Sequence, residues 1–319
     1  MTDGADQALD PIVRDQLLAQ QANRRDRRDT ALAVVRQLVI FAAFLALLAA
    51  SYLGYKALSA AVDDGQTDWP VIGSFLPRGD DLNMPPLGDI VGQFGVVPSG
   101  QDGTYASILA GEALFTLREA AVGFAVGLLI GLGIAIVLAR WRPLERGLLP
   151  YVIASQTIPL IAIAPIVVIW GRQNVDFLPW EWQDWMSVSI IATYLTFFPV
   201  AVNGLRGLQS PSPDHLELME SYAAGWGQTL WRLRLPAAVP YLFAAAKIAA
   251  TASIVGAIVG EISAGVSGGL GRRLLNEAFN YTTGPARLYA SVLGAARLGV
   301  AGLLAVAATE RRGLGRPDR

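Results

Sequence analysis

Apolar positions in this chain gather into long runs, separated by shorter polar segments. Runs of about 18 or more apolar residues are typical of helices that cross a membrane. We expect six transmembrane helices, at residues 33–53, 119–139, 148–170, 186–205, 239–262 and 287–309. The pattern therefore predicts an all-α, polytopic membrane bundle.

The polar segments divide the chain around these helices. We assign an N-terminal segment to 1–32, the first helix to 33–53, a loop to 54–105, a core to 106–310 and a tail to 311–319. Arginines concentrate in 1–32, in 206–238 and in the tail, and such segments stay on the cytoplasmic side. We therefore expect both termini in the cytoplasm.

The segment on the other side of the membrane has a different character. Residues 54–105 are rich in Gly, Pro and Asp, which predicts an irregular extracytoplasmic loop. Residues 105–118 look amphipathic, and we expect a separate helix lying at the membrane interface. Glycines at 265, 268, 269 and 271 predict a turn followed by a short outer helix.

Composition narrows the function. The chain has 319 residues, of which 53% are hydrophobic and 16% charged, and its net charge is −1. That charge favours no nucleic-acid partner. There is no cysteine, which excludes a thiolate metal site. His215 is the single histidine, so we expect neither a histidine metal centre nor a histidine-dependent catalytic triad. Clustered acids are also missing, so we do not expect an enzyme.

One polar segment between two apolar runs carries helix signals. Residues 212–214 read Ser-Pro-Asp, which is typical of a helix start. Gly225 and Gly227 predict a bend, and Leu230, Leu233 and Leu235 continue as a second amphipathic piece that ends at Pro236. The segment predicts two short helices along the cytoplasmic face, either docked on a partner or resting on lipid.

The spacing in this segment resembles the EAA loop of permease subunits in binding-protein-dependent ABC importers. That motif reads Glu-Ala-Ala, three residues, Gly, nine residues, Ile-x-Leu-Pro. Counting back from Pro236 places Leu233 at the Ile, Ala223 at the Gly and Glu217 at the Glu. Because alanine resists the left-handed conformations that glycine allows, Gly225 could shift the bend by two residues.

The resemblance covers roughly residues 105–310 and is nearest to the nitrate/sulfonate/taurine group. Thr116-Leu-Arg118, Gln156-Thr-Ile-Pro159 and Glu261 with the glycines after it are similar to that group. The resemblance implies a type I ABC importer permease fold in the bacterial plasma (inner) membrane. It also implies a homodimer, an external substrate-binding protein and two ATPase subunits that carry ATP and Mg, since this chain has no phosphate-binding loop and is expected to bind no cofactor.

The resemblance also implies residue roles. The residues expected to dock on the ATPase are Glu217, Glu220, Tyr222, Ala223, Ala224, Gly225, Leu233, Leu235 and Pro236.

Other residues are candidates for the substrate pathway or its gate. Polar residues beside a proline kink, small residues on the helix after the loop, and charges within spans suggest this role. They are Gln156, Thr157, Pro159, Gly256, Gly260, Glu261 and Arg297. Arg297 either faces an aqueous path and attracts an anion or pairs with Glu261. The row Gly123, Gly127 and Gly131 either packs within the bundle or forms a gate or homodimer face.

We therefore expect a permease that translocates a small solute, an organic or inorganic anion of the sulfonate, taurine or nitrate type. The alternative substrate is a vitamin precursor such as a pyrimidine or a flavin. A secondary transporter driven by an ion gradient is a further alternative. It would need paired carboxylates within the membrane, and Glu261 is the one membrane carboxylate that we single out from the sequence.

Overall fold

A computed structural model describes residues 35–36, 39–61, 79–175 and 181–313. The segment 1–32 and most of the tail 311–319 lie outside the described residues. The chain divides into two units, Met1–Met84 and Pro85–Arg319.

The first unit contains one long apolar helix, Val39–Ala61. It runs past residue 53, where the sequence predicted its end, so the expected irregular loop at 54–105 includes the last turns of this helix. Lys56 fixes those turns to the residues that follow. Its ammonium group donates to Asp81 Oδ1 at 2.6 Å and to the carbonyl of Met84 at 2.7 Å.

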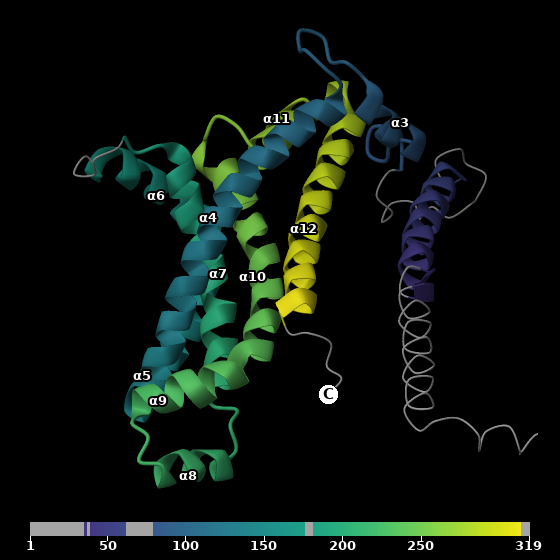
Figure 1. The fold of residues 1–319 in the computed structure, drawn as a ribbon. Helices are drawn as coiled ribbons and strands as arrows, with labels where there is room; N and C mark the ends of the chain where they lie inside the picture. Colours follow the sequence, from purple (N-terminus) through teal and green to yellow (C-terminus); the bar gives the residue numbers. More distant parts are fainter. Residues whose placement is uncertain (1–34, 37–38, 62–78, 176–180, 314–319) are drawn as a thin grey trace, which may run out of the picture. The chain divides into compact units, whose positions relative to one another are not determined.

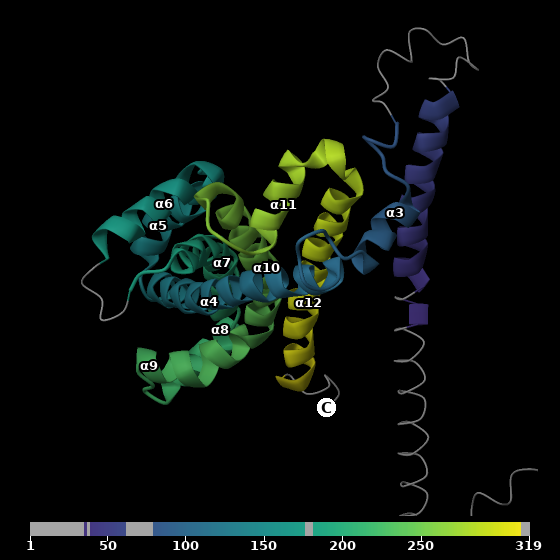
Figure 2. The ribbon, with the colours of Figure 1, turned by 90° about the horizontal axis from the view of Figure 1, so that it is seen from above.

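The second unit is a helical bundle (Figure 1). Its elements are α3 (Leu87–Gly92), η1 (Gln93–Gly95), α4 (Tyr105–Arg140), α5 (Arg142–Ala154), η2 (Ser155–Thr157), α6 (Leu160–Asn174), α7 (Asp184–Leu208), α8 (Pro213–Ser221), α9 (Trp226–Thr229), η3 (Leu230–Arg234), α10 (Leu235–Ala264), α11 (Leu270–Phe279), η4 (Tyr281–Thr283) and α12 (Pro285–Gly313). Helix α7 packs against both α4 and α10, and α5 and α6 lie on the side away from α12 (Figure 2).

The predicted membrane bundle is confirmed. Among the described residues, five helices are long and apolar enough to cross a membrane. A sixth span results if the bent pair Arg142–Thr157 and Leu160–Asn174 counts as one. That pair replaces the kinked helix expected at 148–170, because the two parts meet at 95°. Ile158 before Pro159 is extended, as proline requires of its neighbour, and the helix breaks there.

Helix α4 corrects another expectation. It is continuous over 36 residues from Tyr105 to Arg140, so 105–118 is not a separate interfacial helix. At 1.5 Å per residue the helix is about 54 Å long, whereas the hydrocarbon core of a bilayer is about 30 Å thick.

Small residues hold α4 against α7. A Cβ atom added at Gly123 would lie 2.4 Å from Ala192 Cβ, one at Gly127 2.5 Å from Thr196 Cβ, and one at Gly131 2.6 Å from the Phe197 carbonyl. These distances are shorter than van der Waals contact. The glycine row therefore packs within the bundle, as small residues do where helix backbones approach closely.

The two ends of the bundle differ (Figure 1). Helices α8 and α9 lie at one end, together with the C-terminal end of α12. Helix α11 lies at the other end, after a turn that begins with Gly265 at φ +65°. The predicted glycine turn and short helix are thus confirmed. We call these the α8 end and the α11 end.

Candidate functional site

Helix α8 stands apart from the bundle (Figure 1). Ser212 caps its first turn, where the His215 amide donates to Ser212 Oγ at 3.5 Å, and Pro213 occupies its first position. None of its residues is buried. Leu218 is 52% exposed and the following Tyr222 75% exposed, so apolar surface faces outward at this end.

The helix ends in a turn centred on Ala223. Ala223 has φ +52° and is the one non-glycine residue with positive φ in the described part of the chain. Its amide donates to the Glu220 carbonyl at 2.8 Å, and the Ala224 amide donates to the Met219 carbonyl at 3.0 Å. This pair of bonds is the Schellman motif, in which glycine usually takes the left-handed position. The bend thus lies where the motif spacing predicted, and Gly225, at φ −67°, does not shift it.

The residues after the turn are anchored to the bundle. Arg140 at the end of α4 lies 5.5 Å from the ring centre of Trp226. Arg234 Nη1 donates to the Leu208 carbonyl at the end of α7, at 2.9 Å. Leu230 is buried in an apolar cluster with Leu138 and Leu205, among other residues. The sequence analysis missed these anchors, although Trp226 and Arg234 lie within the motif.

A π-helical segment, Leu230–Arg234, joins this anchor to α10. Pro236 follows in the first turn of α10 and has no N–H to offer the carbonyl four residues earlier. Short π segments frequently mark functional sites. Leu233, Leu235 and Pro236 thus form the junction with α10, whereas Glu217, Glu220, Tyr222 and Ala223 lie on the exposed part.

At the α11 end, side chains from α4 and α10 hold the start of α11. The amides of Gly269, Leu270 and Gly271 donate to Glu112 Oε2 at 2.6 Å, Thr116 Oγ1 at 2.9 Å and Glu261 Oε2 at 2.5 Å. Thr116 Oγ1 also donates to Glu261 Oε1 at 2.7 Å. These amides have no partner within their own helix, and a negative charge is favourable there. We call these residues the outer clamp; they make Glu261 a structural residue.

A second buried carboxyl group lies beside the outer clamp, on Glu119. Its side chain is fully buried next to Glu261, and no described residue donates a hydrogen bond to either of its oxygens. The sequence analysis missed Glu119 because it falls on the first residue of a predicted span. Its position one turn after Thr116, on the same helix face, was the available signal.

The structure places the remaining pathway candidates apart from one another. Arg297 lies 4.7 Å from the ring centre of Phe94, and no described ion pair joins it to Glu261. A Cβ at Gly256 would lie 2.9 Å from Ala192 Cα, and one at Gly260 3.0 Å from Val188 Cγ1. Both glycines are buried at the contact of α10 with α7. This packing gives no support to a pathway role for these three residues.

The family can now be stated. Residues 127–312 match the family described as binding-protein-dependent transport system inner membrane component. The chain belongs to this family. The matched range contains α8, the Ala223 turn and all of α10, and members of the family are transport components of a membrane rather than enzymes.

Relatives in this family have several named solutes. The chain is 30% identical to the formylaminopyrimidine transport permease of Halalkalibacterium halodurans, over 53% of this chain and 66% of the relative. It is 31% identical to the riboflavin transport system permease of Chloroflexus aurantiacus, over 47% and 54%. It is 26% identical to a putative aliphatic sulfonates permease of Bacillus subtilis, over 41% and 44%. The chain thus spans about half to two thirds of these relatives.

In this family member, Gln156 lines a pocket of about 330 Å³ between η2, α7 and α10. Asn203 and Arg206 are the other polar side chains there, and the rest of the lining is apolar, including Leu195, Phe198 and Val202. Thr157 and Pro159 form the break beside the pocket but do not line it. Tyr194 on α7 donates to the Ser155 carbonyl and holds the break in place.

Proposed function

We propose that this chain is the permease subunit of an ATP-driven importer. In this proposal two copies form a homodimer in the plasma membrane, an external binding protein delivers the solute, and a pair of ATPase subunits binds ATP and Mg. The observation that carries it is the exposed α8 ending in a left-handed turn at Ala223, at the spacing of the docking motif. In this proposal the exposed face of α8 enters a groove on the ATPase.

The anchors after the turn supply the coupling. Closure of the ATPase pair would move α8, and the bonds from Trp226 and Arg234 to α4 and α7 would carry that motion into the spans. Rocking of rigid helices about an interface is a common way to alternate access between two sides. Because the connection through the π segment is short, α8 can move only a little without moving α10.

The test compares two exposed acidic residues at different places. We expect Glu217→Ala to lower ATP-dependent uptake in proteoliposomes at least tenfold and to reduce co-purification of the ATPase, without loss of membrane insertion. Glu181→Ala is the matched control, since Glu181 is exposed just before α7 and outside the motif. Full uptake by the Glu217 variant would contradict docking, and ATP-independent uptake by the chain alone would favour a gradient-driven transporter.

For the solute, we propose a nitrogen heterocycle of the pyrimidine or flavin type. The pocket beside Gln156 is mostly apolar and offers the amide groups of Gln156 and Asn203, which can each donate and accept hydrogen bonds. A planar ring with carbonyl and amino groups fits such a lining. The pyrimidine and riboflavin permeases among the relatives support the same class.

A small anion of the sulfonate, taurine or nitrate type is the second candidate. Arg206 lines the same pocket, and the relatives include sulfonate and nitrate permeases. Calorimetry of the binding protein with a formylaminopyrimidine, riboflavin, taurine and nitrate separates the two classes. Saturable binding of an oxyanion and no binding of either heterocycle would replace the first candidate by the second.

A further inference from the structure

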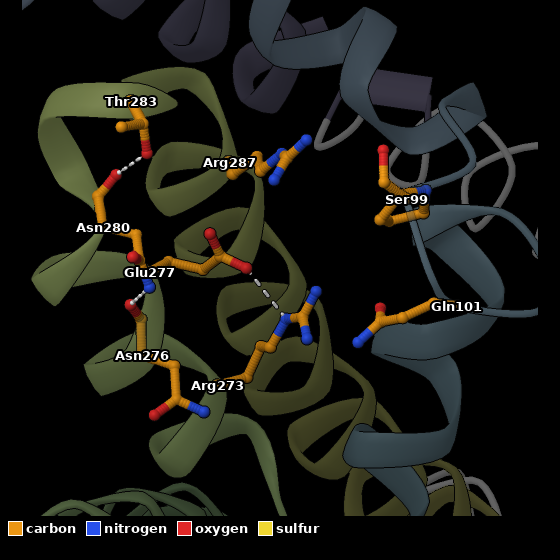
Figure 3. Close-up of a pocket in the computed structure, with 9 residues that line it drawn as sticks. Ser99, Gln101, Arg273, Asn276, Glu277, Asn280, Thr283 and Arg287 are labelled. Carbon is orange, nitrogen blue, oxygen red and sulfur yellow. Dashed lines mark hydrogen bonds and ion pairs between the residues drawn. The ribbon is translucent and has the colours of Figure 1, made fainter.

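A polar pocket of about 300 Å³ lies at the α11 end of the second unit (Figure 3). Its walls come from the segment before α4, from α11 and η4, and from the start of α12. The polar side chains that carry the following argument are Gln101, Arg273, Glu277 and Arg287. The pocket is at the opposite end of the bundle from α8, so the docking site does not account for it.

One side of the pocket is fixed by an ion pair. Arg273 Nε lies 3.0 Å from Glu277 Oε1, and the two side chains are only 13% and 10% exposed. The Arg273 guanidinium also lies 5.0 Å from the ring centre of Tyr105, whose hydroxyl is 2.7 Å from Ser291 Oγ. Arg273 is therefore held in position, and its charge is compensated within the protein.

Arg287 is in a different situation. It enters the pocket from the start of α12, and no described residue forms an ion pair or hydrogen bond with its guanidinium. Figure 3 shows the guanidinium groups of Arg287 and Arg273 reaching into the same space from different helices, with Gln101 on the opposite wall. With Glu277 cancelling Arg273, the pocket has one positive charge left over. A guanidinium fork matches the geometry of a carboxylate.

We propose that this pocket receives a carboxylate side chain, Asp or Glu, of the external binding protein, with Arg287 as its main contact. The proposal rests on the proposed function, because that function supplies a partner at this end. The volume of about 300 Å³ has room for one Asp or Glu side chain. The candidate solute pocket lies elsewhere, beside Gln156, so a protein side chain is the occupant that we assign here.

The experiment uses the full permease–ATPase complex in nanodiscs and the binding protein that supports its uptake. We expect Arg287→Ala to weaken association with the binding protein at least tenfold, and Arg287→Lys to weaken it less. Added salt should weaken the wild-type complex more than the Arg287→Ala complex, because the charge contact is lost in the variant. Arg272→Ala on α11 is the matched control, since Arg272 does not line the pocket, and we expect its binding to equal the wild type.

A charge exchange keeps the test decisive if a variant is poorly folded. Arg287→Glu should lose binding, and one Asp or Glu to Lys change on the binding protein should restore it. Unchanged binding in both Arg287→Ala and Arg287→Glu would overturn the proposal. So would an Arg287-dependent thermal stabilisation of the permease by acetate that binding protein does not compete with, since that indicates a free anion. Wild-type uptake is measured first, so failure of the proposed function would be seen separately.

Discussion

The two termini of helix α10 differ in how exposed their surroundings are and in which parts of the chain hold them. At the α8 end the chain that leads to it, through the anchored π segment, includes the exposed helix α8 and a turn at Ala223 that is closed by hydrogen bonds between nearby residues. At the α11 end it is held by the outer clamp, whose side chains come from helices far apart in the sequence and are fully buried at Thr116 and Glu261. Exposed local structure suits a surface that must meet a partner, whereas a buried network resists motion.

Both ends contain a glutamate that the family resemblance singles out, yet the two have different environments. Glu217 is exposed on α8, and Glu261 is fully buried among amide and hydroxyl donors. Substitutions at the α11 end should therefore reduce stability, and those at the α8 end should change coupling with little effect on stability. The following variants test that division.

The largest loss of stability is expected for Gly271→Ala. A Cβ atom there would lie 2.3 Å from the Ile258 carbonyl oxygen and 2.9 Å from Glu261 Cβ, so α11 must shift and the clamp must open. We expect a loss of about 4 kcal/mol in unfolding free energy, from overpacking and a lost buried hydrogen bond. Gly225→Ala, where nothing lies within 4 Å of the added atom, is the control and should be close to neutral. Denaturant titration in micelles measures the unfolding free energy of both variants. Equal losses would contradict the claim that the α11 end determines stability and the α8 end does not.

Thr116→Val should lower the free energy of unfolding by about 3 kcal/mol. Valine keeps the shape but removes the donor to Glu261 and the acceptor for the Leu270 amide, which leaves two buried groups unsatisfied. Thr116→Ser keeps the hydroxyl and should lose less than half as much. Thermal unfolding of the two variants checks this ranking, and a serine variant as unstable as the valine variant would show that packing, not hydrogen bonding, dominates.

A smaller effect is expected at Glu119. Two buried carboxyl groups side by side repel each other when both are charged. Glu119→Gln keeps the size and brings an amide donor toward Glu261, so we expect stability equal to the wild type or about 1 kcal/mol higher. Glu119→Ala should lower stability because it leaves a cavity. A glutamine variant that unfolds as easily as the alanine variant would mean that Glu119 acts through its charge.

The smallest effect is expected at the α8 end. Ala223→Gly removes the cost of a left-handed alanine, about 1 kcal/mol, and should slow hydrogen exchange of the amides in the turn while preserving uptake. Ala224→Gly is the control because its φ is not positive, and it should speed exchange. Faster exchange in Ala223→Gly would indicate that the turn is set by contacts other than backbone strain.

The sequence predicted the turn at Ala223 better than the outer clamp, for a physical reason. The motif fixes the number of residues between the turn and Pro236, so counting back along the chain located the turn at Ala223. The preference of turns for glycine pointed instead to Gly225. The carbonyls of Met219 and Glu220 accept the closing bonds, and their place on the helix decides which residue turns.

The clamp depends on tertiary packing that one sequence cannot show. The glycines at 265–271 predicted the turn, but nothing in the chain order indicates that Thr116 would meet Glu261. A proline at 159 predicts a bend, and the bend reaches 95° in a structure in which Tyr194 on another helix bonds to the Ser155 carbonyl. Such partners are found only once the helices are placed side by side.

The unbroken length of α4 has a mechanical consequence. One terminus of this rod carries Arg140, which contacts Trp226 just after the Ala223 turn, and the other carries Tyr105, which contacts Arg273 in the polar pocket. A stiff rod that tilts about its middle moves both of its tips at once. Under the proposed function, a tilt that ATPase closure imposes at one tip would reach the contact of Tyr105 with Arg273 at the other tip, without a relay of intermediate side chains.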